Sequence, residues 1–155
     1  HILPMYAPTV NSYKRLVEGA WAPTTITWGL DNRTTALRII NDTPKHTRLE
    51  TRIPGADTNP YLAMSAALAS GLYGIKHKLP LTIPATIGNG CQDIASGQLV
   101  SDLKEAAIPM QSSAVAQELF GNDFVQHFTN TRLWEWRQFS KQVTDWELKR
   151  YFEII

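Results

Sequence analysis

Arginine is concentrated in one part of this sequence, around a single glutamate. Between residues 31 and 52 the chain places four arginines and one glutamate: Arg33, Arg38, Arg48, Arg52 and Glu50. The formal net charge of the whole chain is only +1, so this excess of guanidinium groups is local. A guanidinium is a rigid, always-charged fork that matches phosphate and carboxylate oxygens, and the segment therefore indicates a site for a polyanion.

The spacing of three of these residues predicts a shared face. Arg48, Glu50 and Arg52 alternate along the chain, and residues two apart in a β-strand point to the same side. One interpretation is a solvated strand face with its own ion pairs. The other is a polyanion site, in which the lone carboxylate either balances the charge or holds a metal that also contacts the phosphates.

Composition limits the class of protein. A chain of 155 residues with 43% hydrophobic and 19% charged side chains is typical of one soluble globular domain. The near-zero net charge argues against a general nucleic-acid binder, and no apolar stretch is long enough for a membrane span. Cys91 is the single cysteine, which excludes an internal disulfide and fits a reducing compartment.

The element that must position the arginines is a small sheet. Strands are predicted at residues 25–28, 36–40 and 48–53, separated by turns around residues 30–32 and 41–44. The simplest arrangement is an antiparallel β-meander followed by packing helices, which is an α+β fold.

Helices are predicted after the strands. Asn59 and Pro60 form a helix start, and apolar or small residues then recur at helical spacing up to Ile75, so we expect this helix to be buried scaffold. Residues 79–98 are predicted to form a long loop that lies across another surface or another subunit. A short helical turn is expected near residues 102–107, and helices are expected at residues 113–120 and from residue 123, with a restart at Thr144 through a capping box.

Four stretches together resemble the C-terminal part of the catalytic domain of the glutamine synthetase family. They are residues 11–16 (NSYKRL), 31–38 (DNRTTALR), 48–57 (RLETRIPGAD) and 59–75, in the order and spacing of the family. The resemblance covers nearly the whole chain, residues 1–155. The residues of these stretches are most similar to those of the γ-glutamyl-polyamine and γ-glutamylamide synthetase-like members.

The resemblance implies an ATP-dependent reaction. ATP would phosphorylate the side-chain carboxylate of glutamate, and an amine would then attack the acyl phosphate and form an amide. By resemblance, Arg15 and Arg52 hold the glutamate carboxylates. Arg33 is the catalytic residue of the set, at the γ-phosphate and the acyl phosphate, and so it also binds substrate and nucleotide.

Four further residues match the family's nucleotide and metal positions. Arg38, Lys45 and Arg48 correspond to positions near the ATP phosphates, and Glu50 corresponds to a ligand of Mg²⁺ or Mn²⁺. Cations of this kind stabilise a phosphoryl group in transfer mainly by position and charge. Lys45 as plain solvated surface and Arg38 as a structural residue remain alternative interpretations.

The flap loop departs from the ammonia-using pattern. Ammonia-using members carry a glutamate two residues before the loop proline, whereas this chain has Trp21 two residues before Pro23. Glu18 lies three positions earlier and would have to shift to replace that glutamate. An indole can present its face to a cationic or apolar amine, and the alternative is that Trp21 merely packs the loop.

The chain also looks like a piece of a longer protein, because it starts at His1 and not at a methionine. By resemblance, the N-terminal β-grasp domain, the first part of the catalytic domain and the other metal-binding glutamates would lie upstream. The resemblance implies a cytoplasmic homo-oligomer with a site shared between subunits, and the fragment alone is expected to be inactive. The alternatives are an ammonia-using glutamine synthetase, a non-catalytic scaffold relative and a simple anion-binding module.

Overall fold

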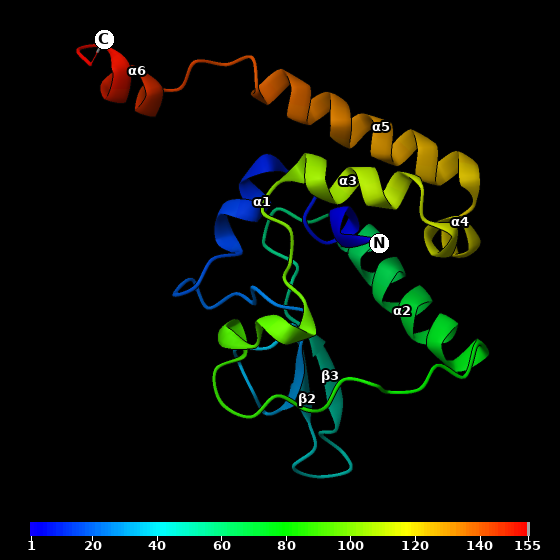
Figure 1. Cartoon of the computed structure of the whole chain (residues 1–155). Helices are drawn as coiled ribbons and strands as arrows, with labels where there is room; N and C mark the ends of the chain where they lie inside the picture. Colours follow the sequence, from blue (N-terminus) through cyan, green and yellow to red (C-terminus); the bar gives the residue numbers. More distant parts are fainter. Residues whose placement is uncertain (155) are drawn as a thin grey trace.

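The structure is a computed structural model that describes residues 1–154. Over these residues it contains one three-stranded sheet and six α-helices, which confirms the predicted α+β class. The strands are β1 (Trp28–Leu30), β2 (Leu37–Ile40) and β3 (Arg48–Thr51), in the spatial order β1-β2-β3. Figure 1 shows the sheet at one end of the molecule and the helices gathered at the other.

The sheet is mixed, so the prediction of an antiparallel meander is only half right. Strands β2 and β3 are antiparallel, whereas β1 and β2 are parallel, with Trp28 opposite Leu37. The turn residues after β1 do not make a hairpin. Asn32 accepts hydrogen bonds from the backbone and hydroxyl of Thr34 at 3.0 and 2.6 Å, and Thr35 donates to the Asn32 carbonyl at 2.9 Å. These local bonds compete with strand pairing, and the chain doubles back to the start of β1.

The predicted loop at residues 79–98 runs along the free edge of β1. Its Thr86 amide donates to the Trp28 carbonyl at 2.9 Å, and the Trp28 indole donates to the Ile83 carbonyl at 2.8 Å. Two short 3₁₀ turns lie within it, η2 (Gly90–Gln92) and η3 (Ile94–Ser96). The other surface that the loop crosses therefore belongs to this same chain.

Helix α2 (Pro60–Lys76) begins where predicted but packs on a different face. The Asn59 side chain accepts from the amides of Tyr61 and Leu62, as an N-cap does. The buried positions are the small residues Ala63 and Ala66. The larger residues that predicted a buried stripe are exposed instead: Tyr61, Ser65, Leu68, Leu72 and Ile75. Small side chains let the backbone approach closely, so the narrow face of α2 meets the core.

The main core joins the N-terminus to the last helices. The other elements are η1 (Leu3–Met5), α1 (Val10–Arg15), α3 (Leu103–Gln111), α4 (Ala114–Phe120), α5 (Asn122–Phe139) and α6 (Asp145–Tyr151). Met5, Ala66, Met110 and Val125 are fully buried together. Helix α3 runs beyond the predicted residue 107, through Pro109, while Ser113 caps α4 and a Thr144 capping box starts α6 as predicted. None of the helices in residues 1–154 combines the length and apolar character needed to cross a membrane.

Candidate active site

The strand pair β2–β3 brings two arginines onto one glutamate. Arg38 lies opposite Glu50 in the sheet and donates to its Oε2 at 3.0 Å, while Arg48 donates to Oε1 at 3.2 Å. Arg38 also binds Asp31, with its Nε 3.0 Å from Oδ1. The predicted common face is therefore confirmed for Arg48 and Glu50, with Arg38 close by, whereas Arg52 lies one residue beyond the end of β3.

The charges of this cluster hold Glu50 in its ionised form. Partial desolvation by itself would raise the pKa of Glu50, but the hydrogen bonds and charges of Arg38 and Arg48 outweigh it and lower that pKa. Hydrogen bonding to Asp31 is the largest cause of a raised pKa at Arg38. The cluster is thus an ion-pair network on a sheet face, and part of its positive charge is already compensated.

Glu50 offers one oxygen donor group to a metal ion. Carboxylate oxygens suit Mg²⁺ and Mn²⁺, so the chemistry of this side chain fits the predicted role. In the part of the chain that the structure describes, no three His, Cys, Asp or Glu residues gather at a spacing suited to a metal. Glu50 therefore offers one carboxylate group, and its role as a metal ligand stays a prediction.

Arg52 connects three segments just beyond the end of β3. Its guanidinium donates to the Trp21 carbonyl at 2.9 Å and to the Arg33 carbonyl, and its amide donates to the Ala36 carbonyl at 2.9 Å. Burial is the largest cause of its lowered pKa, and the positive charges of Arg38, Arg33 and Arg15 act in the same direction. Arg52 thus lies within the field of the other arginines and holds the Trp21 loop beside them.

Two further predicted residues occupy very different environments. Arg15, at the end of α1, donates to the Ile53 carbonyl, and its buried Nε has no partner among residues 1–154. Lys45 is exposed in the loop between β2 and β3, with no hydrogen bond or ion pair to the described residues. The geometry brings Arg15 to the arginine group and leaves Lys45 outside it, and the role of each residue stays a prediction.

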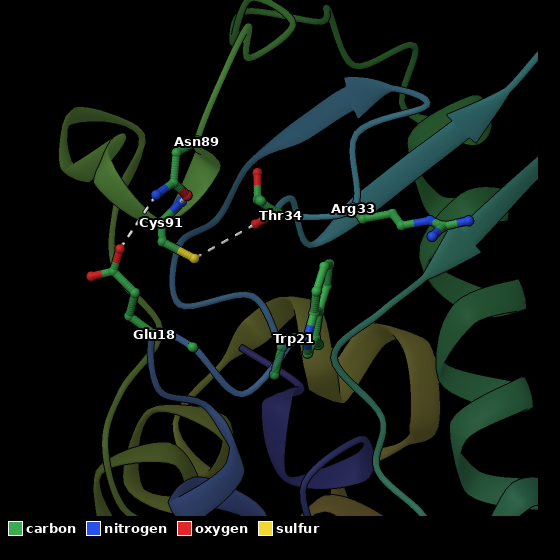
Figure 2. A pocket seen from close by; sticks show the side chains of 8 residues that line it. Glu18, Trp21, Arg33, Thr34, Asn89 and Cys91 are labelled. Carbon is green, nitrogen blue, oxygen red and sulfur yellow. Dashed lines mark hydrogen bonds between the residues drawn. The ribbon is translucent and has the colours of Figure 1, made fainter.

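A cavity of about 360 Å³ lies between the Trp21 loop and the loop that follows β1. Figure 2 shows the side chains around it. The cavity is lined by Glu18, Gly19, Trp21, Ala22, Arg33, Thr34, Asn89 and Cys91. Trp21 is 77% exposed and has a φ of 55°, a left-handed conformation that is uncommon for a large side chain. The indole therefore stands at the cavity and does not pack into the core.

Two lining residues did not stand out in the sequence. Asn89 and Cys91 come from the loop at 79–98, which the sequence marked only by its turns. The Thr34 hydroxyl accepts from the Gly90 amide at 2.7 Å, and Asn89 accepts from the Cys91 amide at 3.0 Å. The Gly88-Asn89-Gly90 turn was the available signal, but nothing in the sequence indicated which surface it would meet.

Known proteins resemble this chain over almost all of its length. The family model described as the glutamine synthetase catalytic domain matches residues 1–151. Type-1 glutamine synthetase 2 of Dictyostelium discoideum is 52% identical over 99% of this chain and 30% of its own length. A glutamate–isopropylamine ligase of a Pseudomonas species is 44% identical over 97% of this chain and 33% of its own length. The γ-glutamylethanolamide synthetase GlnA4 of Streptomyces coelicolor is 43% identical over 96% of this chain and 32% of its own.

A solved structure has the same fold. A structure described as a GmaS/ADP complex superposes with a TM-score of 0.81 at 34% identity, covering 98% of this chain and 36% of that one. The chain thus spans about a third of the length of the relatives it matches. The fold, the arginine-rich sheet and these similarities lead to one conclusion: the chain belongs to the glutamine synthetase family and corresponds to part of its catalytic domain.

Proposed function

We propose that residues 1–155 are the C-terminal part of the catalytic domain of an ATP-dependent glutamate–amine ligase. The longer protein would form an amide through a γ-glutamyl phosphate. The observation that carries this proposal is that Trp21 and Arg33 line one cavity, with Arg52 bonded to the backbone of both. That arrangement puts a group suited to an amine beside groups suited to an acyl phosphate.

The arginines have separate tasks in this reaction. Arg15 and Arg52 hold the carboxylates of glutamate, an assignment that rests on their match to the family motif. Arg33 is exposed at the cavity edge and stabilises the phosphoryl group during transfer and the phosphate as it leaves. Arg38, Arg48 and Lys45 are assigned to the nucleotide phosphates by their match to the family's positions.

A divalent cation, Mg²⁺ or Mn²⁺, completes the nucleotide site. It would neutralise phosphate charge when bound, and Glu50 is the residue of this chain that would contribute an oxygen ligand. The remaining ligands come from segments outside this sequence. A cytoplasmic homo-oligomer in which subunits share each site accommodates this division, and the family's assembly is the basis for proposing it.

The nucleophile of the reaction can be an amine or ammonia in this family. Names of two similar proteins specify amines, isopropylamine and ethanolamine, and Trp21 at the cavity favours an amine over ammonia. An ammonia-using glutamine synthetase is the second candidate. The 52% identity with a protein named glutamine synthetase supports that candidate.

A phosphate-release screen on the full-length protein tests the proposal. ATP and glutamate are supplied with ammonia, isopropylamine, ethanolamine or a polyamine in parallel, and inorganic phosphate is measured. We expect release that requires glutamate and is fastest with a small amine. Release that is fastest with ammonia favours the second candidate, and a folded protein without glutamate-dependent release contradicts both.

A further inference from the structure

We propose that Asp57 and Gly55 are positioning residues for the glutamate substrate, because they fix helix α1 and the side chain of Arg15 at its end. This inference rests on the ligase function proposed above, in which Arg15 and Arg52 hold the carboxylates of glutamate. Asp57 and Gly55 need not touch the substrate in this role. They act through the place and the orientation of the Arg15 guanidinium.

Helix α1 is too short to hold Arg15 in place by itself. It runs over six residues from Val10 to Arg15, so Arg15 is its last residue. Helices shorter than about 12–15 residues are marginal in water even when they consist of good helix formers. The position of Arg15 therefore depends on the groups to which α1 is bonded.

The first turn of α1 is bonded to Asp57. Asp57 Oδ2 accepts hydrogen bonds from the hydroxyls of Thr9 and Ser12 at 2.7 and 2.6 Å. Thr9 and Ser12 are also the two residues that form the capping box of α1, so Asp57 binds the cap itself. A carboxylate near the N-terminus of a helix is stabilised by the helix dipole as well. One side chain thus fixes the start of α1 to the segment that follows β3.

The last residue of α1 is bonded to the same segment. The Arg15 guanidinium donates from Nη2 to the Ile53 carbonyl, and Ile53 follows Arg52 directly. Residues 53–57 therefore hold α1 at both of its ends. Because this segment starts next to Arg52, it also places the two guanidinium groups that are assigned to glutamate relative to each other.

The Arg15 side chain lies directly against Gly55. A Cβ at Gly55 would lie 3.1 Å from Arg15 Nε and 2.7 Å from Asp57 Oδ1, so the guanidinium and the carboxylate both approach the bare α-carbon. Arg15 Nε is buried and has no hydrogen-bond partner within residues 1–154. Gly55 thus provides the space in which the Arg15 side chain lies beside Asp57.

Steady-state kinetics of the full-length protein separate positioning from stability. Asp57→Ala removes the acceptor of both hydroxyls, and the KM for glutamate should rise roughly 10- to 100-fold, because a displacement of about 1 Å can cost that much. The KM for ATP should stay close to that of wild type. A role in stability alone would lower kcat through the amount of folded enzyme and leave the KM for glutamate unchanged. Asp123→Ala, at an exposed position at the start of α5, is the control and should match wild type.

Gly55→Ala tests the same role without removing a charge. Its Cβ would displace Arg15 and Asp57, so the KM for glutamate should rise roughly tenfold. Gly71→Ala is the matched control, because a Cβ there would meet nothing within 4 Å, and it should leave that KM unchanged. Asp57→Asn keeps an oxygen that can accept from both hydroxyls, and its KM should lie between those of wild type and Asp57→Ala.

A double-mutant cycle tests whether Asp57 acts through Arg15. Arg15→Ala should lower kcat/KM for glutamate by itself, because it removes the guanidinium that binds the carboxylate. In that background Asp57→Ala should lower kcat/KM by less than about a further threefold, since effects that run through one group are not additive. Two effects that multiply would show that Asp57 acts independently of Arg15 and would overturn the inference.

The outcomes distinguish the positioning role from the ligase function. An unchanged KM for glutamate in both Asp57→Ala and Gly55→Ala would overturn the positioning role while leaving the ligase function intact. A KM for ATP that rises by the same factor would also overturn it, because the substitutions would then distort the whole site. A wild-type protein without glutamate-dependent phosphate release refutes the ligase function and this inference with it.

Discussion

Arg33 can be altered without disturbing the contacts that its backbone makes. Its carbonyl accepts from Arg52, whereas its side chain is exposed at the cavity. A truncated side chain therefore removes the guanidinium and keeps the link between the two loops. This separation makes Arg33 a clean position at which to test electrostatic stabilisation.

We predict that Arg33→Ala in the full-length protein lowers turnover by about 10²- to 10³-fold, the effect of removing one donor to a developing anion. The nucleotide KM should rise much less, because the group acts on the phosphoryl group in transfer. Steady-state kinetics measure both values. Arg137→Ala, at an exposed position on α5, is the control, and unchanged turnover in Arg33→Ala would remove this residue from the mechanism.

Substitutions at Trp21 test whether the enzyme prefers an amine or ammonia as its nucleophile. An indole face contributes about 0.5–2 kcal/mol to a bound cation, which is roughly tenfold in affinity. Trp21→Glu should therefore raise the rate with ammonia relative to the rate with an amine by about one order of magnitude. Trp21→Phe keeps an aromatic face and should shift the ratio little. If wild type already prefers ammonia to every amine tried, Trp21 only packs its loop.

At the scale of elements, the close approach of the long loop to β1 depends on a glycine. A Cβ at Gly29 would lie 2.9 Å from the Asn32 Cβ and 3.1 Å from the Thr86 carbonyl oxygen. Asn32 and Thr86 belong to the two segments that hold β1 in its parallel pairing with β2 and against the loop. Space at this position is therefore a condition for the mixed sheet.

Two identical substitutions should have opposite signs. Gly29→Ala is expected to lower the free energy of unfolding by about 1–3 kcal/mol, because backbone and loop must move to relieve the contacts. Gly71→Ala, inside α2 with open space around it, is expected to raise it by about 0.5–1 kcal/mol through helix propensity. Urea unfolding measures both, and equal effects would mean that the loop does not press on β1.

Asp57 links the segment after β3 to helix α1. Its Oδ2 accepts from the hydroxyls of Thr9 and Ser12 at 2.7 and 2.6 Å. Partial burial by itself would raise the pKa of Asp57, but these hydrogen bonds, with the charge of Arg15, lower it below the usual 3.8. A lowered pKa means that this stability is present above pH 3.8 and is lost as the pH falls through the folded-state value.

We predict that Asp57→Ala lowers the free energy of unfolding by about 1 kcal/mol at neutral pH, a small value because the group is exposed to solvent. The difference from wild type should shrink as the pH falls below 3.8. Urea titrations at several pH values measure it. Asp42→Ala, at an exposed position between β2 and β3, should match wild type throughout, and a difference that persists in acid would rule out the carboxylate as the cause.

At the scale of the whole molecule, the described residues leave one side of α2 uncovered. Tyr61 is 82% exposed and Ile75 76%, and Leu68 and Leu72 continue the same apolar run. Figure 1 shows α2 starting below α3 and running obliquely away from it toward the end of the molecule that carries the sheet. A row of large apolar side chains in water is costly, which agrees with a chain that spans about a third of its relatives.

Because the chain spans only about a third of its relatives, we also expect it to bind nucleotide poorly by itself. Arg38 is bonded to Asp31 and Glu50, and Arg48 to Glu50, so this sheet face presents less free positive charge than its arginines suggest. We predict that the 155-residue chain alone binds ATP weakly or not at all, since a phosphate site needs several cations held together. Calorimetry with and without Mg²⁺ tests this, and micromolar, magnesium-dependent binding by the chain alone would contradict it.

The sequence by itself determined the features that depend on near neighbours. Helix starts at Asn59, Ser113 and Thr144 follow from side chains that cap amides two or three residues away. The common face of Arg48 and Glu50 follows from the two-residue period of a strand. Family membership also lay in the sequence, because the quoted stretches keep residue type, order and spacing together.

Only the tertiary structure decided what lies next to what. The parallel pairing of β1 and β2 depends on side-chain bonds that fold residues 31–36 back, and turn composition alone suits a hairpin equally well. The burial of Ala66 in place of Leu68 depends on which elements reach α2. The hydrogen bond between Glu18 and Asn89, 71 residues apart, depends on the surface against which the long loop packs. Periodicity and capping are short-range, whereas packing partners are set by contacts that no local pattern encodes.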